Sequence, residues 1–362
     1  MSELPFHRER AGATVATPIS RRDLHDFDDI LDARSPSEFA EDHLPGATSV
    51  PVLDDEERAL VGTVYKQRSA FEAKRVGAPI AARNIAAHVE RLFADKPREW
   101  KPLVYCWRGG GRSGSLVHVL RQVGWDARQL EGGYKAFRRQ IVAELETLPG
   151  RLDFRVVCGA TGSGKSRLLE ALAAAGAQVL DLEVLAAHRG SVLGELPGAP
   201  QPSQKAFETA IWSGLSGFDS SRPVFVESES KKVGNLRVPE HLIERMRASR
   251  CVRLEADVDT RVALLLEDYA HFVGEPGALA AKLDLLRDLH GAERIAAWKG
   301  HLEAGRWHPL VRDLLENHYD PAYRRSLFRN YRDAQGAAAV EVRGISPEEF
   351  GRLARDLAAE NG

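Results

Sequence analysis

A glycine-rich segment at residues 159–166 constrains the fold of this chain more than any other feature. It reads Gly-Ala-Thr-Gly-Ser-Gly-Lys-Ser and follows a short apolar, β-prone run, Phe154–Cys158. Residues 166–175 have helix-favouring composition and end before Gly176. A loop of this kind between a strand and a helix is a P-loop, whose backbone N–H groups and helix N-terminus attract phosphate oxygens. The segment therefore predicts an α/β fold with a phosphate-binding site.

The P-loop predicts roles for particular residues. Lys165 is expected to reach the terminal phosphate, and the Ser166 hydroxyl is expected to bind Mg²⁺. The backbone of the loop should surround the remaining phosphate oxygens. The predicted phosphate-binding residues are Gly159, Gly162, Ser163, Gly164, Lys165 and Ser166, and Ser166 is the predicted metal ligand.

A second strand–loop–helix segment carries a cysteine. An apolar run, Leu103–Tyr105, precedes Cys106, and residues 113–123 have the composition of a helix that ends at Gly124. Loop N–H groups and nearby arginines stabilise a thiolate, which is the nucleophilic form of cysteine. Cys106 is thus the predicted catalytic residue, and the predicted anion-binding residues are Arg108, Gly109, Gly110, Gly111 and Arg112. The alternative is an inert buried cysteine, which is our interpretation of Cys158 and Cys251.

The surroundings of both loops resemble a known family. Residues 32–39 (DARSPSEF), 43–47 (HLPGA) and 130–134 (LEGGY) resemble the rhodanese-like domain. A rhodanese-like domain with Tyr-Cys-Trp-Arg-Gly-Gly-x-Arg-Ser at 105–113, joined to a P-loop domain, is similar to the tRNA 2-selenouridine synthases. Further matching stretches are residues 61–66, 181–183, 188–191, 201–205, 227–230 and 318–321, with Tyr323.

This resemblance extends from about Ser20 to Ser326. It implies an α/β chain with an N-terminal rhodanese-like domain and a P-loop NTPase-like parallel-sheet domain with a helical C-terminal extension. It also implies an enzyme that replaces the sulfur of wobble 2-thiouridine in certain tRNAs by selenium. Selenophosphate would donate the selenium, and a selenophosphate-supplying synthetase would be a partner.

The resemblance further implies geranyl diphosphate as a co-substrate, so that the six P-loop residues would bind a diphosphate. There is a chemical reason for such a step, because a thiocarbonyl at C2 of a uridine is a poor leaving group. Alkylation of the sulfur makes C2 electrophilic and lets geranyl thiol depart as selenium arrives. Mg²⁺ and Lys165 would stabilise the departing diphosphate.

The length of the cysteine loop agrees with a phosphate-sized donor. Five residues separate Cys106 from Arg112, as in the related Cys-x5-Arg phosphatases and one more than in many sulfurtransferases of this fold. A phosphatase usually has His before the cysteine, where this chain has Tyr105. Two roles for Cys106 stay open, a perselenide carrier or a residue that positions the donor. Arg108 and Arg112 would clamp the anion in either case.

Carboxylates follow two strand-like runs of the P-loop domain. Asp181 follows one such run and Glu227 follows another, where P-loop proteins place carboxylates that orient Mg²⁺ or act as bases. We predict these roles for Asp181 and Glu227. Glu183 and Glu229 fit the same role and a solvated loop position equally well.

Binding of tRNA must depend on local patches, because 50 basic and 52 acidic residues give a net charge of −2. Residues 298–332 mix basic and aromatic side chains, which suit RNA phosphates and splayed bases, or equally a packed helical pair. A second basic patch at residues 65–75 reads more readily as a solvated helix face. The candidate tRNA contacts are Lys66, Arg189, Arg324 and Arg325.

The expected domain borders follow the alternation of apolar and helical segments. Residues 1–19 are expected to be a loose lead-in, and residues 20–147 the rhodanese-like domain with the Cys106 loop. The P-loop domain is expected over residues 148–256, after the linker-like Leu-Pro-Gly at 148–150. Residues 257–362 are expected to be mainly helical, with a strand at 338–342, and to be the candidate tRNA-contacting region.

Composition adds an expected compartment. Three widely spaced cysteines do not form a disulfide framework and fit a reducing environment. Apolar runs of membrane-spanning length and a charged-then-apolar leader are both lacking in the sequence. We therefore expect a cytoplasmic protein without a membrane contact.

Two other classes of function remain open at this level. One is a rhodanese-type sulfurtransferase fused to an ATP-dependent, kinase-like domain that acts on a small acceptor. The other is a non-enzymatic RNA-binding module with a vestigial P-loop. The intact motif at residues 159–166 argues against the second class.

Overall fold

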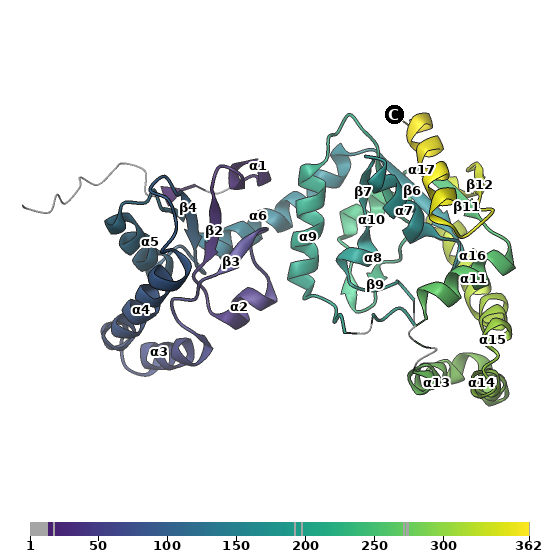
Figure 1. Cartoon of the computed structure of the whole chain (residues 1–362), viewed down its shortest axis with the longest axis horizontal. Coiled ribbons are helices and arrows are strands. Elements are labelled where there is room, and N and C mark those ends of the chain that lie inside the picture. Colours follow the sequence, from purple (N-terminus) through teal and green to yellow (C-terminus); the bar gives the residue numbers. More distant parts are fainter. Residues whose placement is uncertain are drawn as a thin grey trace, which may run out of the picture. The chain divides into compact units, whose positions relative to one another are not determined.

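The computed structural model describes residues 14–16, 19–191, 193–196, 198–270, 272 and 275–361. The chain forms two compact units, and the border between them follows Glu144 in the sequence (Figure 1). Each unit is built around its own parallel sheet, as the predicted α/β class requires. No helix of the described residues is both long and apolar enough to cross a membrane.

The first unit holds a five-stranded sheet in the order β1-β5-β4-β2-β3, in which all neighbouring strands run parallel. Its strands are β1 (Thr14–Val15), β2 (Asp29–Asp32), β3 (Ala47–Ser49), β4 (Pro102–Tyr105) and β5 (Arg128–Leu130). Its helices are α1 (Arg21–Leu24), α2 (Pro36–Glu41), α3 (Asp55–Gln67), α4 (Ala70–Leu92), α5 (Gly111–Val123) and α6 (Gly133–Thr147).

The predicted lead-in, residues 1–19, contributes a strand to this sheet. Thr14 pairs with Gln129 and Val15 with Leu130, so β1 forms an edge of the sheet. Residues 1–13, 17 and 18 lie outside the described residues. The sheet of the first unit thus begins earlier in the chain than residue 20.

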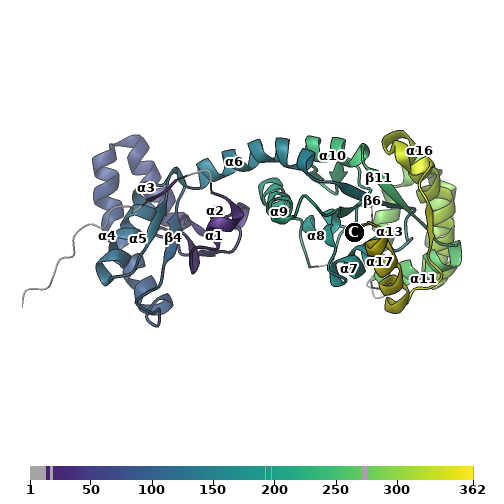
Figure 2. The ribbon, with the colours of Figure 1, turned by 90° about the horizontal axis from the view of Figure 1, so that it is seen from above.

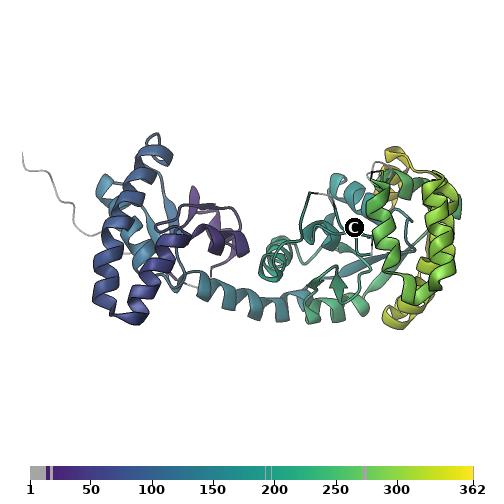
Figure 3. The ribbon, with the colours of Figure 1, turned by 90° about the horizontal axis from the view of Figure 1, so that it is seen from below.

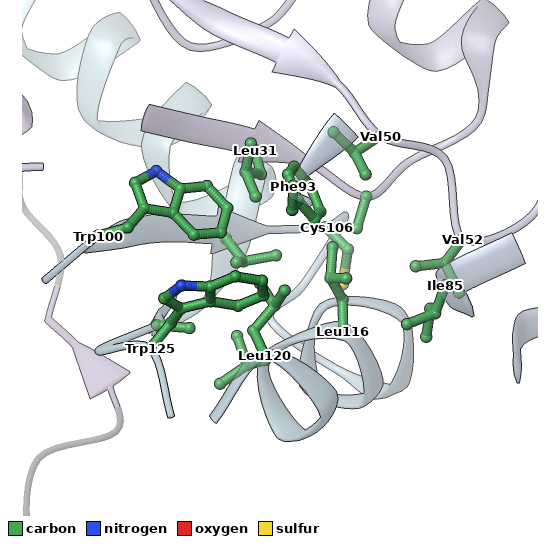
Figure 4. Packing of buried hydrophobic residues seen from close by; sticks show 14 residues of the cluster. Leu31, Val50, Val52, Ile85, Phe93, Trp100, Cys106, Leu116, Leu120 and Trp125 are labelled. Atoms are coloured by element: carbon green, nitrogen blue, oxygen red, sulfur yellow. The ribbon is translucent and has the colours of Figure 1, made fainter. Parts of the chain in front are cut away.

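The core of the first unit lies between the sheet and helices α4 and α5. Trp100 and Trp125 meet edge to face, with ring centroids 5.2 Å apart. Cys106 belongs to the same apolar cluster, close to Leu116 (Figure 4). Helices α3 and α4 form a hairpin inserted between β3 and β4, and Gly77 of α4 packs against Val61 of α3 (Figure 3).

The second unit holds a five-stranded parallel sheet in the order β12-β11-β6-β8-β7 and a two-stranded antiparallel ribbon, β10-β9. The strands are β6 (Phe154–Gly159), β7 (Gln178–Leu180), β8 (Val224–Glu227), β9 (Lys232–Val233), β10 (Leu236–Arg237), β11 (Arg250–Glu255) and β12 (Ala339–Glu341). These positions confirm the predicted strand at Phe154–Cys158, the two strand-like runs that lead to Asp181 and Glu227, and the strand predicted within residues 338–342.

Helices make up most of the rest of this unit. They are α7 (Lys165–Ala174), α8 (Leu182–Leu185), α9 (Gln204–Gly217), α10 (Glu240–Arg247), α11 (Val258–Asp268), α13 (Pro276–Asp284), α14 (Arg287–Glu303), α15 (Trp307–Leu314), α16 (Asp320–Asn330) and α17 (Pro347–Asn361). Short helical turns η1 (Leu148–Arg151), η2 (Leu315–Tyr319) and η3 (Arg332–Gln335) complete the unit. The region beyond residue 256 is mainly helical, as expected.

The C-terminal segment completes the P-loop sheet. Strand β12 pairs with β11, and α17 packs beside α7, the helix that follows the P-loop (Figure 2). Phe350 of α17 is 2% exposed and lies directly under Gly164, where an added Cβ would approach its ring to 2.5 Å. The end of the chain therefore supports the phosphate-binding loop.

Phe350→Ala should destabilise the second unit. Truncation of a buried aromatic side chain costs about 3–5 kcal/mol, because the surrounding side chains fill the cavity only partly. Urea denaturation followed by tryptophan fluorescence measures the loss. The matched control Leu289→Ala, at a side chain that is 72% exposed, should change the free energy of unfolding by less than about 0.5 kcal/mol. Equal stabilities of the two variants would contradict this role of Phe350.

Candidate active sites

Cys106 lies at the carboxyl end of β4, and its loop leads into the amino end of α5. Its sulfur accepts hydrogen bonds from the Gly110 N–H at 3.3 Å and from the Ser113 hydroxyl at 3.0 Å. The Gln129 side chain donates to the Gly109 carbonyl at 2.7 Å and to the Ser113 Oγ at 2.9 Å. Two donors thus point at the sulfur of Cys106.

The backbone of the turn after β5 packs so closely against the cysteine loop that side chains would clash between them. Gly133 has a φ of +55°, and a Cβ there would lie 2.2 Å from the Cys106 carbonyl oxygen. Gly109 has a φ of +64°, and a Cβ there would lie 2.7 Å from the Leu130 carbonyl oxygen. The Tyr134 N–H also donates to the Cys106 carbonyl, at 2.9 Å. The glycines therefore fix the path of the loop.

A buried ionic network holds the backbone on both sides of the loop. Arg34 donates to both carboxylate oxygens of Asp32, and the two side chains are 1% and 0% exposed. The Tyr105 hydroxyl, one residue before the cysteine, also donates to Asp32, at 2.7 Å. The Arg34 guanidinium lies 3.9 Å from the centre of the Tyr134 ring. Removal of Asp32 or Arg34 would leave the other buried charge unpaired, which is strongly destabilising.

The two arginines of the loop differ in their contacts. Arg112 binds Glu38 at 2.6 Å, and Arg58 of α3 binds the same carboxylate at 3.0 Å. Burial, the largest single effect, raises the pKa of Glu38, but the Arg112 hydrogen bond and charge, the Ser35 N–H and the Arg58 charge together outweigh it and lower the pKa of this carboxyl. Arg108 is exposed and has no ion-pair partner among the described residues. Arg108 is thus open to an incoming anion, whereas Arg112 already has a carboxylate partner.

The P-loop connects the carboxyl end of β6 with α7. Gly162 and Gly164 have φ values of +78° and +85°, which L-residues with a side chain rarely adopt. The Lys165 ammonium donates to the Gly159 carbonyl at 2.9 Å. The buried Ser163 hydroxyl has no hydrogen-bond partner within the described part of the chain. All six predicted phosphate-binding residues therefore lie in one strand-to-helix turn, as the motif requires.

The carboxylate that meets the P-loop is Glu183. The Ser166 hydroxyl donates to the Glu183 Oε2 at 3.0 Å. Glu227 ends β8, the neighbour of β6, and its carboxylate accepts the Glu183 N–H at 2.8 Å. Asp181 caps α8 by accepting the Val184 N–H at 2.8 Å. Sequence reasoning selected Asp181 and Glu227 and left Glu183 open, although Glu183 makes the direct contact with Ser166.

Crowding and burial change the acidity of these carboxyl groups. Burial raises the pKa of Asp181 to about 6 and that of Glu229 to about 8. Burial and the neighbouring Asp181 and Glu183 charges raise the pKa of Glu227 well above its ordinary range. A cation would relieve this repulsion between negative charges. The acidic groups are therefore suited to a site that also receives positive charge.

The donor atoms beside the P-loop suit a Mg²⁺ ion that is also bound by a phosphate, and not a metal site made of protein ligands alone. Ser166 and Glu183 offer oxygen atoms, which Mg²⁺ prefers, and this ion commonly takes one or two protein ligands together with phosphate oxygens and water. Among the described residues, no three His, Cys, Asp or Glu side chains are arranged to hold a metal ion by themselves. Ser166 and Glu183 are thus the residues that would hold Mg²⁺ beside a bound phosphate.

A cleft of about 850 Å³ lies over the P-loop, and we call it the P-loop cleft. Its walls include the loop itself, Asp181, Glu183, Glu229 and Tyr323. Arg189 also lines it, with its guanidinium 4.8 Å from the Tyr269 ring centre and a 2.6 Å hydrogen bond to the Asp268 carbonyl. The ring and the carbonyl thus hold the Arg189 side chain, which was predicted to bind tRNA, at the wall of this cleft.

A second cavity, of about 60 Å³, adjoins the cleft, and we call it the apolar chamber. Side chains from the α11, α13 and α15 region line it, among them Leu265, Tyr269, Leu279, Trp307, Leu310 and Val311. Thr161, Ser191, Leu265 and Tyr269 line both cavities. Sequence reasoning missed this chamber, because its walls come from helices far apart in the chain, each with an ordinary apolar face.

The remaining candidate tRNA contacts occupy helix surfaces. Lys66 is exposed near the end of α3, where exposed Tyr65 and Phe71 flank it. Arg325 is exposed on α16, and the side chain of Arg324 lies outside the described residues. Part of the 298–332 patch is core, because Trp298 and Tyr331 are 0% and 3% exposed. These two aromatic side chains are packed inside and do not offer stacking surfaces.

Together the units define a chain in which a rhodanese-like domain with a cysteine loop precedes a P-loop domain. Residues 16–140 match the family model for the rhodanese-like domain, and residues 152–282 match the model for the tRNA 2-selenouridine synthase AAA domain.

Relatives named tRNA 2-selenouridine synthase are similar over much of the chain. The protein of Nitrosomonas europaea is 36% identical over 66% of this chain and 63% of its own length. The protein of Alcanivorax borkumensis is 34% identical over 83% of this chain and 90% of its own length, and that of Marinobacter nauticus is 31% identical over 90% and 94%. The chain belongs to the tRNA 2-selenouridine synthase family.

The raised pKa of Glu229 predicts a pH-dependent stability. Between the ordinary carboxyl pKa of 4.5 and the folded value of about 8, the folded chain binds a proton that the unfolded chain has lost. Stability should therefore fall as the pH rises through this range. Glu229→Gln should flatten the dependence in thermal unfolding followed by circular dichroism, and the exposed-site control Glu303→Gln should not. A slope unchanged by Glu229→Gln would contradict the buried protonated state.

Proposed function

We propose that this chain is a tRNA-modifying transferase that replaces the sulfur of a wobble 2-thiouridine by selenium. One observation carries the proposal: the chain joins a thiol loop with inward-pointing donors to a complete P-loop under a cleft of about 850 Å³. A cleft of this volume has room for a nucleoside together with a diphosphate. Relatives of this chain are named tRNA 2-selenouridine synthase, which supports the proposal.

In the first step, the P-loop binds the diphosphate of geranyl diphosphate. The thiouridine sulfur attacks C1 of the geranyl group, the C1–O bond breaks, and diphosphate leaves while the N3 proton passes to solvent or a nearby base. Lys165 and the backbone N–H groups of the loop stabilise the growing charge on the leaving group. Mg²⁺ held by Ser166 and Glu183 would neutralise part of this charge.

In the second step, the cysteine loop receives selenophosphate. Gly109, Gly110 and Gly111 offer backbone to the anion, and the exposed Arg108 supplies charge. Arg112 contributes to the positive potential while it is bound to Glu38. The selenium of selenophosphate attacks C2, the C2–S bond breaks, and the geranyl thiolate leaves and takes up a proton. Water then attacks the phosphorus, the Se–P bond breaks, and phosphate departs to give 2-selenouridine. Cys106 positions the donor, because a perselenide formed from selenide-level selenium would need a two-electron oxidant, and a synthetase that makes selenophosphate would supply the loop.

A two-stage assay tests this order of steps. An anticodon stem-loop RNA with 2-thiouridine is incubated with geranyl diphosphate and Mg²⁺, then with selenophosphate, and its nucleosides are analysed by mass spectrometry. Lys165→Ala should lower formation of the S-geranyl nucleoside by about 10²–10³-fold, because it removes a charge that stabilises the leaving group. Cys106→Ser should block only the selenium step, and the control Cys251→Ser should affect neither.

Other products would contradict the proposal. If neither S-geranyl nor seleno-nucleoside forms, while sulfur passes from thiosulfate to a small acceptor with consumption of ATP, the chain is a sulfurtransferase fused to a kinase-like domain. If the RNA binds unchanged under all conditions, the chain is a binding module.

The α3–α4 hairpin supplies a candidate tRNA contact. Lys66 and Arg68 are exposed at its tip, and Arg91 is exposed near the opposite end of α4. The double change Lys66→Glu with Arg68→Glu should weaken tRNA binding in a filter-binding assay. The slope of the logarithm of the binding constant against the logarithm of the salt concentration should fall by the amount expected for the loss of about two phosphate contacts. The control Arg91→Glu should leave affinity and salt dependence as in the unmodified chain. Equal effects of both changes would argue against a specific contact at the tip.

A further inference from the structure

Arg112 of the cysteine loop already holds a carboxylate. Its Nη1 lies 2.6 Å from the Glu38 Oε2, and its Nη2 lies 3.5 Å from the Glu38 Oε1. Arg112 is the second residue of α5, the helix that begins at the cysteine loop. A guanidinium binds carboxylate and phosphate groups through the same planar pair of N–H donors. A donor anion at the loop therefore competes with Glu38 for Arg112.

Glu38 has other donors besides Arg112. The Ser35 N–H donates to its Oε2 at 3.2 Å and the Ser35 hydroxyl at 3.3 Å, within the capping box of α2. The Arg58 Nε lies 3.0 Å from the same oxygen, and the Glu38 side chain is 10% exposed. A buried carboxylate that loses its only cation becomes an unpaired charge, which is strongly destabilising. Because Arg58 also binds Glu38, Arg112 can leave this carboxylate without that loss.

The position of Arg58 is set by the first turn of α3, in the inserted hairpin. The Asp55 carboxylate of this turn accepts the Ser37 N–H of α2 at 3.2 Å, which ties the two helices together beside Glu38. Asp55 also lies close enough to Arg58 to interact with its charge, but the Asp55 oxygens are bound to Ser37. The Arg58 side chain is 49% exposed. Arg58 thus reaches Glu38 from a helix outside the cysteine loop.

We propose that Arg58 is a positioning residue of the donor site: it retains Glu38 when Arg112 turns from this carboxylate to the oxyanion of the selenium donor. The inference rests on the proposed function for the identity of the donor, a tetrahedral anion of the phosphate type. It adds a residue that the loop motif does not contain and an exchange of ion-pair partners that opens the site. Arg58 acts through Glu38 and does not touch the donor.

Calorimetric titration of the full chain with thiophosphate tests this exchange. Thiophosphate has the shape of selenophosphate, with sulfur in place of selenium. Lys165→Ala is present in every protein, including the parent, so that binding at the P-loop is weakened equally. Arg58→Ala should weaken thiophosphate about tenfold, the loss expected for one charge-assisted hydrogen bond, because Glu38 then keeps Arg112. The control Arg91→Ala, at an exposed arginine of α4, should leave the affinity unchanged.

A second change separates an effect through Glu38 from a direct contact with the donor. Glu38→Gln removes the competing charge, and glutamine still fits the capping box of α2. Combined with Arg58→Ala, it should restore the affinity for thiophosphate at least to that of the parent. A double variant as weak as Arg58→Ala, or an unchanged affinity in Arg58→Ala alone, would overturn the inference.

Thermal unfolding followed by circular dichroism shows whether each variant keeps its fold. If Glu38→Gln does not, Arg58→Lys decides the question without a change at Glu38, because lysine keeps the charge and loses the planar fork. Its affinity for thiophosphate should lie between those of the parent and Arg58→Ala. A value as low as that of Arg58→Ala would count against a role that depends on the charge of Arg58, and so against the inference.

The titrations contain no RNA. A loss of thiophosphate affinity that depends on Glu38, in a chain that forms no seleno-nucleoside, would contradict the proposed function and leave the role of Arg58 standing. In the selenium step with S-geranyl RNA, Arg58→Ala should raise the KM for selenophosphate and change kcat little. Formation of the seleno-nucleoside with an unchanged KM would contradict the role of Arg58 and leave the proposed function standing.

Discussion

Both candidate sites depend on backbone N–H groups at a turn from a parallel strand into a helix. Such groups attract anions only if the backbone turns sharply enough to point them inward, and glycine permits this turn. Gly162 and Gly164 adopt positive φ in the P-loop, and Gly109 does so in the cysteine loop. Neighbouring groups hold each turn closely, with Phe350 under the first loop and Gly133 against the second.

Helix α11 connects the anion site of the second unit with its apolar chamber. Arg261 of α11 donates to the Thr161 carbonyl at 2.9 Å and is paired with Asp320 of α16 at 2.6 Å. On the same helix, Leu265 packs under Gly162 and lines the chamber. One helix thus contacts both the anion-binding turn and the apolar cavity beside it. The helices beyond residue 256 therefore help to shape the P-loop site.

Local patterns predicted the parts of the chain whose structure is decided locally. A strand, a glycine-rich turn and a helix follow one another in sequence, so both loops, the order of their elements and the family were recognisable from the residues alone. The strand at residues 338–342 was predicted as well, but its partner β11 lies more than eighty residues earlier, and local pattern does not identify such partners. The same limit applies to the pairing of Arg112 with Glu38 and of Ser166 with Glu183. For Trp298 and Tyr331 the local pattern did not decide burial. A segment that mixes aromatic and basic residues has the same composition whether its aromatic side chains face solvent or the core.

The central claim is that the P-loop binds the diphosphate of the alkylating co-substrate. A crystal structure of the chain with Mg²⁺ and geranyl thiolodiphosphate, which resists cleavage at C1, tests it most directly. The diphosphate should accept hydrogen bonds from the N–H groups of residues 162–166. A diphosphate bound elsewhere, with the P-loop empty, would contradict the claim.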